Sequence, residues 1–276
     1  MLGIFDSGVG GLTVAAAIRR QAPDADLLYF GDVANAPYGP KSSEELFAIT
    51  MRAMCFLRSH GVTDFVAACN SVSVSVIQPL IDIFGVQPIR LIEMVGPSAR
   101  ALRHQSSGKT VVIATQATVS SRMYERIFSR QGLSVEMMAV PALAFAIEQG
   151  RPQKEIQNII GPVINKMIRT KAKTLVFGCT HFPLVRFLFE EELTRRGSKM
   201  VLFDPSDAVA SEVVQAFDMR GNGLNTFFIS NESDVFRAKV AILFGPQVNI
   251  EVTHVDNSVD NQWKENPFQA CGLLSE

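Results

Sequence analysis

Short runs of apolar residues alternate along this chain with longer stretches in which apolar residues recur at helical spacing. The runs predict strands over Leu2–Phe5, Leu27–Phe30, Phe65–Ala68, Pro88–Ile92, Thr110–Ala114, Val135–Met138, Thr174–Phe177, Met200–Phe203, Thr226–Ile229 and Val248–Val252. A capping box at Ser42 and Glu45 predicts the start of one intervening helix. The apolar face of this helix is formed by Leu46, Ile49, Ala53 and Leu57. The alternation predicts an α/β fold with mainly parallel sheets covered by helices, whose ligands bind beyond the carboxyl ends of the strands.

The chain also repeats itself. FVAACNS at 65–71 is similar to LVFGCTH at 175–181, and LGIFDSGVGG near the N-terminus is similar to VVIATQATVS at 111–120. The two matches at similar offset predict two related, pseudo-symmetric α/β halves. The alternative is chance similarity between buried strands.

Composition and charge indicate which classes of protein this chain can belong to. The 276 residues are 47% hydrophobic and 19% charged, with a net charge of −1, which is typical of a compact chain with a large core. Such a balance favours neither nucleic acid nor an anionic membrane as partner. No apolar run approaches the roughly 18 residues of a membrane span, and no signal peptide is visible. We expect a cytoplasmic protein.

Two of the four cysteines stand out. Cys69 and Cys179 each follow a predicted buried strand, so each thiol is expected near the first turn of a helix, where N–H groups favour thiolate. The alternative is a small buried apolar residue. Cys55 is expected to pack in the core, and Cys271 lies in a polar tail, 256–276, of little chemical consequence. No CxxC pair occurs and the histidines are scattered, so we expect no metal site. In a cytoplasmic protein we expect the four thiols to be mostly reduced.

A glycine-rich turn follows the first predicted strand, with Asp6 and Ser7 ahead of Gly8, Gly10 and Gly11. Such a turn can bind an anion through backbone N–H groups. Thr13 breaks the dinucleotide fingerprint, although Asp32 stands at a plausible distance for a ribose contact. A carboxylate at Asp6 would repel phosphate, and suits a group that binds an ammonium or orients a proton.

Several further positions have both a structural and a functional interpretation. Tyr38-Gly39 belongs to an ordinary turn or offers a hydroxyl and an N–H to a ligand. Thr115 and Thr118 are helix caps or donors to a carboxylate. His181 is structural or supports Cys179, and Glu148 is a surface helix end unless a ligand site recruits it.

Four blocks, GIFDSGVGGLTV, YFGDVANAPYGPKS, ACNSVS and GCTHFPL, are together very similar to glutamate racemases in order and spacing, and the agreement runs from Gly3 to about Val255. The resemblance implies two α/β domains that face each other across the active site. It assigns residues 1–94 and 208–276 to the first domain and residues 95–207 to the second.

The resemblance also implies residue roles. It makes Cys69 the base that faces D-glutamate and Cys179 the base that faces L-glutamate, with Asp6 assisting the first and Glu148 and His181 the second. The matching substrate-binding positions are Asp6, Ser7, Tyr38, Gly39, Asn70, Ser71, Thr118, Thr180 and His181. Two opposed acid/base groups suit racemisation, which removes a proton from one face of Cα and returns one to the other.

The chain departs from the family at three places. Ser71 replaces a usual threonine, Val72 replaces a usual alanine, and residues 140–145 read Val-Pro-Ala-Leu-Ala-Phe instead of Cys-Pro-Leu-Phe-Val-Pro. Two alternatives therefore stay open: a racemase of aspartate or another amino acid, and a binding protein that has lost turnover.

The expected partner is a small amino acid, and the chain shows neither a lysine motif for pyridoxal phosphate nor an intact dinucleotide fingerprint. We therefore expect no cofactor and no metal. The resemblance leaves a homodimer open. It also implies a role in supplying D-glutamate for peptidoglycan, and so in cell-wall biogenesis and cell shape.

Overall fold

The computed structural model describes residues 1–79, 90–103 and 108–255. Its strands form two sheets in which every neighbouring pair is parallel. The first sheet has the order β10-β9-β2-β1-β3-β4, with β1 (Leu2–Asp6), β2 (Leu27–Gly31), β3 (Asp64–Ala67), β4 (Leu91–Glu93), β9 (Asn225–Ile229) and β10 (Ile250–Val252). The second has the order β6-β5-β7-β8, with β5 (Thr110–Ala114), β6 (Val135–Ala139), β7 (Thr174–Gly178) and β8 (Val201–Phe203).

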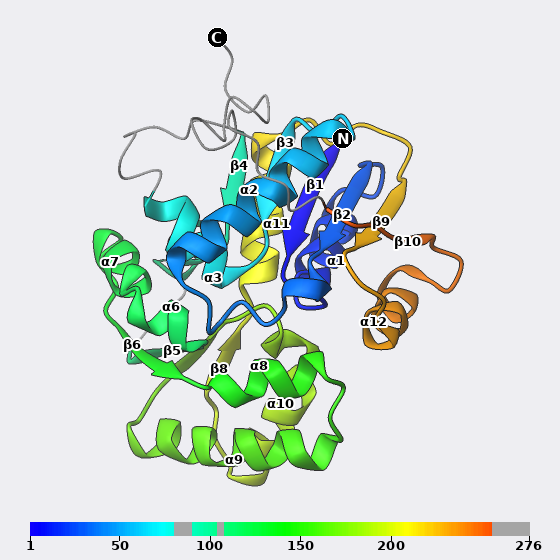
Figure 1. The fold of residues 1–276 in the computed structure, drawn as a ribbon. Coiled ribbons are helices and arrows are strands. Elements are labelled where there is room, and N and C mark those ends of the chain that lie inside the picture. The colour runs from blue at the N-terminus through cyan, green and yellow to red at the C-terminus, as the bar shows by residue number, and fades with distance from the viewer. Residues whose placement is uncertain (80–89, 104–107, 256–276) are drawn as a thin grey trace.

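Helices surround both sheets (Figure 1). They are α1 (Leu12–Gln21), α2 (Ser43–Ser59), α3 (Asn70–Val72), α5 (Val95–Arg103), α6 (Gln116–Ser120), α7 (Met123–Arg130), α8 (Pro141–Glu148), α9 (Gln153–Arg169), α10 (Arg186–Arg195), α11 (Pro205–Ala216) and α12 (Asp234–Phe244). Shorter helical turns are η1 (Val33–Asn35), η2 (Ser73–Ile77) and η3 (Phe182–Val185). The predicted α/β class is thereby confirmed.

The pattern of apolar residues explains these elements. β1, β2 and β7 are buried along their whole length, as expected for parallel strands covered on both faces. The predicted capping box is present, because the Ser42 hydroxyl accepts from the Glu45 N–H while the Glu45 carboxylate accepts from the Ser42 N–H. The α2 positions that were expected to face the core, Leu46, Ile49, Ala53 and Leu57, are all buried.

All ten predicted strands are present, most within one or two residues of their expected ends. The first two residues of the expected strand Pro88–Ile92 lie outside the described residues, as does the tail 256–276 with Trp263 and Cys271. The predicted repeat is visible in the topology, because β2-β1-β3-β4 and β6-β5-β7-β8 have the same order within their sheets.

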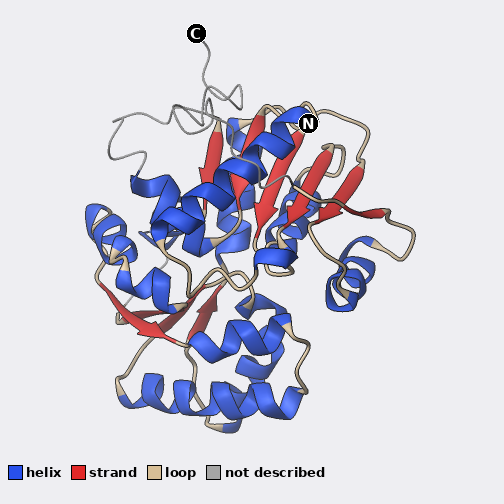
Figure 2. Ribbon diagram, viewed as in Figure 1, coloured by secondary structure: helices blue, strands red, loops and turns tan. Residues whose placement is uncertain are grey.

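We use the name first lobe for the six-stranded sheet with its helices and second lobe for the four-stranded sheet with α6, α7, α8, α9 and α10. The arrowheads of the six-stranded sheet point toward the second lobe (Figure 2), so the carboxyl ends of its strands lie near the boundary between lobes. The domain limits at 94/95 and 207/208 remain our proposal. The second of these limits falls inside α11.

Candidate active site

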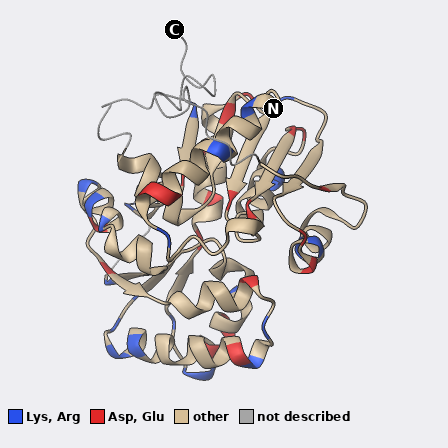
Figure 3. Ribbon diagram, in the orientation of Figure 1, with Lys and Arg blue, Asp and Glu red and all other residues tan. Residues whose placement is uncertain are grey.

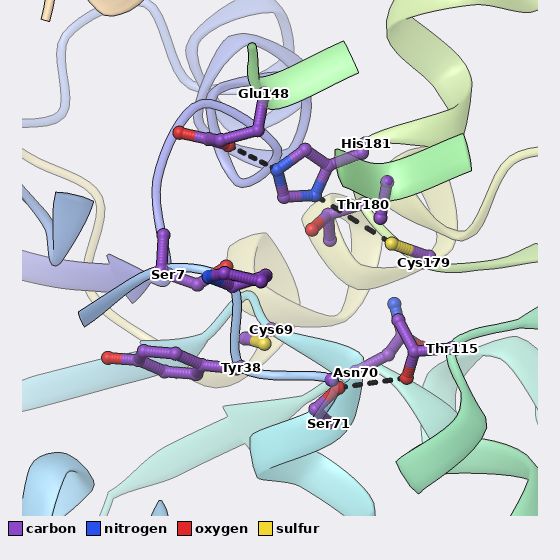
Figure 4. Close-up of a pocket in the computed structure, with 14 residues that line it drawn as sticks. Ser7, Tyr38, Cys69, Asn70, Ser71, Thr115, Glu148, Cys179, Thr180 and His181 are labelled. Carbon is purple, nitrogen blue, oxygen red and sulfur yellow. Dashed lines mark hydrogen bonds and ion pairs between the residues drawn. The ribbon is translucent and has the colours of Figure 1, made fainter. Parts of the chain in front are cut away.

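A small cavity lies where the lobes meet, and both lobes supply its walls (Figure 4). Its volume of about 30 Å³ leaves room for roughly two water molecules. It is lined by Ser7, Ala36, Pro37, Tyr38, Gly39, Cys69, Asn70, Ser71, Thr115, Ala144, Glu148, Cys179, Thr180 and His181. Most of the residues chosen from the sequence therefore come together in one enclosed place.

Cys69 belongs to the first-lobe wall. It follows β3 and precedes α3, as the sequence predicted, and its side chain is buried. Burial, with a further contribution from the Asp6 carboxylate, raises the pKa of the Cys69 thiol far above its usual value. The N–H groups of Val72 and Ser71 act in the opposite direction but do not compensate. The N–H groups of the helix start therefore favour thiolate at Cys69 as expected, but removal of the thiol from water outweighs their effect on its pKa.

Cys179 belongs to the second-lobe wall and has different neighbours. Its sulfur lies 3.7 Å from Nδ1 of His181, and Nε2 of the same ring contacts the carboxylate of Glu148 (Figure 4). Burial disfavours a charged imidazole, but the hydrogen bonds to Cys179 and Glu148 raise the pKa of His181 well above its usual value. The sulfur atom and the carboxylate on either side of His181 therefore favour the protonated form of its ring.

Glu148 is a buried residue at the end of α8, and not the surface helix end that was the alternative. Besides His181 it contacts the first lobe, because its Oε2 accepts from the Val9 N–H at 3.4 Å. Gly8 leaves room for this approach, since a Cβ there would collide with both Glu148 carboxylate oxygens. The glycine-rich turn thus receives a carboxylate side chain from the opposite lobe.

Asp6 ends β1 and points back into its own turn. Its carboxylate accepts from the Gly11 N–H at 2.8 Å and from the Gly8 N–H at 3.3 Å, and Thr180 donates to it across the lobe boundary at 3.3 Å. Burial raises the pKa of Asp6, although the positive charge of His181 and the Gly11 N–H favour its ionised form. Asp6 is close enough to influence Cys69 electrostatically, yet it is not among the described residues that line the cavity.

Asn70 and Ser71 extend the Cys69 wall toward the second lobe. The Ser71 hydroxyl lies 3.1 Å from that of Thr115, which in turn lies 3.1 Å from the Thr118 hydroxyl. Thr115 lines the cavity, whereas Thr118 is fully buried behind it. Contact of Thr118 with a substrate stays a prediction, and Thr115 is the better placed of the two threonines.

The loop after β2 contributes Tyr38 and Gly39. The Tyr38 ring lines the cavity, but its hydroxyl donates to Asp32 at 2.7 Å and is not free to meet a ligand there. Asp32 also accepts hydrogen bonds from Asn35 and Ser230, so its carboxylate stabilises this loop. These bonds give no support to the ribose contact that the sequence left open for Asp32.

The departures from the family pattern have different surroundings. Ser71 and Ala144 line the cavity, whereas Val72 is fully buried in the first-lobe core and is not among the described lining residues. Phe145 is 46% exposed and points away from the interior. Of these departures, Ser71 and Ala144 are therefore the ones placed to contact a ligand in the cavity.

Cys55 packs against the first-lobe core, as expected. Cys69 and Cys179 are free.

Charges of both signs occur on the outer elements of both lobes (Figure 3). Within residues 1–79, 90–103 and 108–255, no cluster of three His, Cys, Asp or Glu side chains could hold a metal ion. In the same ranges no helix is both long and apolar enough to cross a membrane.

Comparison with known proteins matches this architecture to a family. Residues 12–213 match the model of the Asp/Glu/Hydantoin racemase family. The chain therefore belongs to this family and is an amino-acid racemase, an isomerase.

Within this family, the chain is similar to glutamate racemases. A glutamate racemase from Aquifex aeolicus (strain VF5) is 31% identical over 91% of this chain and 97% of its own length. A glutamate racemase structure from Bacillus anthracis shares 27% identity with a TM-score of 0.80, covering 92% of this chain and 97% of the other. The Escherichia coli glutamate racemase, in complex with L-glutamate and the activator UDP-MurNAc-ala, shares 26% identity with a TM-score of 0.70, covering 93% and 98%. The resemblance noted from the four sequence blocks is confirmed.

Proposed function

We propose that this protein interconverts L-glutamate and D-glutamate by a two-base mechanism, with Cys69 and Cys179 acting on opposite faces of Cα. The observation that carries the proposal is the placement of the two thiols, which follow equivalent strands of the two lobes and line one cavity. The Aquifex aeolicus relative is named a glutamate racemase, and the Escherichia coli relative binds L-glutamate.

In this mechanism one cysteine removes the Cα proton as thiolate while the other delivers a proton as thiol. His181, whose ring is held by Glu148 and lies against the Cys179 sulfur, assists Cys179 as the base for L-glutamate. Burial raises the pKa of Cys69 and so favours its thiol form, which in this scheme delivers the proton when L-glutamate is the substrate. Hydroxyl and amide groups on the walls, among them Ser7, Asn70, Ser71, Thr115 and Thr180, bind the carboxylates and stabilise the carbanion.

Asp6 assists Cys69 as a positioning group for the substrate ammonium or for the proton. No step of this scheme requires a cofactor or metal. D-glutamate made in this way would enter peptidoglycan, the role that the resemblance implies for cell-wall biogenesis.

The test is a substrate panel followed by circular dichroism, with chelator present and without pyridoxal phosphate. We expect glutamate to lose its optical activity from either enantiomer, and aspartate and other amino acids to react at least 100-fold more slowly, on the order of 3 kcal/mol in barrier. A faster reaction with aspartate, or glutamate activity that returns only on adding a metal or pyridoxal phosphate, would contradict the proposal.

A further inference from the structure

Tyr124 is a fully buried residue of α7, in the second lobe, and its hydroxyl reaches across to the first lobe. It donates to Oδ1 of Asn70 at 2.5 Å, between residues 54 positions apart in the sequence. Tyr124 itself is not among the described residues that line the cavity. Its hydroxyl is joined to the cavity wall by this hydrogen bond to Asn70.

The other end of the Asn70 amide is unpaired. Asn70 is 2% exposed and lines the cavity, and its Nδ2 is a buried donor without a hydrogen-bond partner among the described residues. A buried polar group without a partner is costly and rare in folded proteins. An amide held with its oxygen on Tyr124 presents its NH2 group as a donor that a ligand can satisfy.

We propose that Tyr124 is a positioning residue for the racemase reaction, and that it fixes the Asn70 amide so that Nδ2 donates to a carboxylate of the amino-acid substrate. The inference rests on the proposed function and adds a residue to it. Without the tyrosine hydroxyl the amide can rotate by half a turn. It then presents Oδ1, an acceptor, to a carboxylate that can only accept.

A double-mutant cycle tests this action through Asn70. Tyr124→Phe removes one oxygen atom and keeps the ring in the core, and we expect KM for glutamate to rise roughly tenfold with a smaller change in kcat. In the Asn70→Ala background the same change should alter KM less than about twofold, because the group that Tyr124 orients is gone.

Tyr29→Phe is the matched control. Tyr29 is equally buried, and its hydroxyl donates to the Gly8 carbonyl at 2.7 Å rather than to Asn70. Its effect on KM should be the same in the presence and absence of Asn70. An equal effect of Tyr124→Phe in both backgrounds would show a merely structural hydroxyl and overturn the inference.

A second measurement needs no substrate and separates this inference from the proposed function. In protein labelled with ¹⁵N-asparagine, the side-chain NH2 resonances of Asn70 are identified by their loss in Asn70→Ala. Tyr124→Phe should shift and broaden them, and Tyr29→Phe should leave them in place. Unchanged resonances in Tyr124→Phe would refute the positioning role even if glutamate is racemised, and shifted ones would support it even if glutamate is not the substrate.

Discussion

The two walls of the cavity follow from equivalent strands but differ in charge. On the first wall, β3 leads to Cys69, and β1 ends in Asp6 behind it. On the second wall, β5 leads to Thr115 and β7 to Cys179. Burial, with a further contribution from Asp6, raises the pKa of the Cys69 thiol, whereas the Cys179 sulfur lies 3.7 Å from Nδ1 of His181. The duplicated fold thus supplies opposed positions, and a few side chains make the two bases unequal before substrate arrives.

The largest expected effect comes from removing either sulfur. Cys69→Ser and Cys179→Ser should each lower racemisation by roughly a thousandfold or more, because a serine hydroxyl is a far weaker acid than a thiol. Each variant should still abstract one proton, visible as elimination from a substrate with a leaving group at Cβ. Cys69→Ser should spare the L enantiomer and Cys179→Ser the D enantiomer. Parent-like racemisation by either variant would remove that cysteine from the mechanism.

The next effect concerns the charge beside Cys179. His181→Asn should lower kcat from L-glutamate by about 100-fold and affect D-glutamate less. Because the pKa of His181 is raised, the ring stays protonated at neutral pH and loses its proton only as pH rises through that higher value. The parent's rate from L-glutamate should therefore fall on the alkaline side, and this fall should be absent from the pH profile of His181→Asn. An unchanged profile would contradict the role of the cation.

A smaller effect is expected where Glu148 meets the first lobe. Gly8→Ala places a methyl against the Glu148 carboxylate, which must then move from His181. We expect kcat to fall about 10- to 100-fold, since a displacement near 1 Å is enough for such a loss. Glu148→Gln should give a loss of similar size without the clash. A normal kcat in both variants would show that this carboxylate does not support His181.

The smallest effect is expected at the family departure. Ser71→Thr restores the usual residue with one added methyl and keeps the hydroxyl that meets Thr115. Glutamate turnover should be retained or raised, with kcat/KM within about threefold of the parent, well under 1 kcal/mol. If this change abolishes glutamate activity while another amino acid is racemised by the parent, glutamate is not the substrate.

The strands and the cysteine positions could be predicted because they depend on local patterns. Apolar runs marked every strand, and parallel strands necessarily bring residues such as Cys69 and Ser7 to one edge of a sheet. Contacts across the lobes, such as Tyr124 with Asn70 or Val9 with Glu148, have no local signal. The tyrosine hydroxyl is only one of several buried groups whose partner depends on how the lobes dock.

The protonation state of a buried side chain likewise could not be predicted from the residues next to it in the sequence. A helix start near Cys69 suggested thiolate, but the pKa depends on how far the thiol is withdrawn from water and on Asp6 nearby. The hydroxyl of Tyr38 shows the same limit. The sequence identified the residue at the cavity, and only the structure shows that Asp32 occupies its hydroxyl.

The most direct test of two opposed bases is the early reaction in deuterated water, started from each enantiomer separately. If Cys69 and Cys179 stand on opposite faces, the group that removes the proton is not the one that returns it. The product should then carry solvent deuterium at Cα while recovered substrate carries almost none, measured by mass spectrometry after chiral separation. Comparable deuterium in both pools from the first turnovers would instead indicate one shared base and contradict the account.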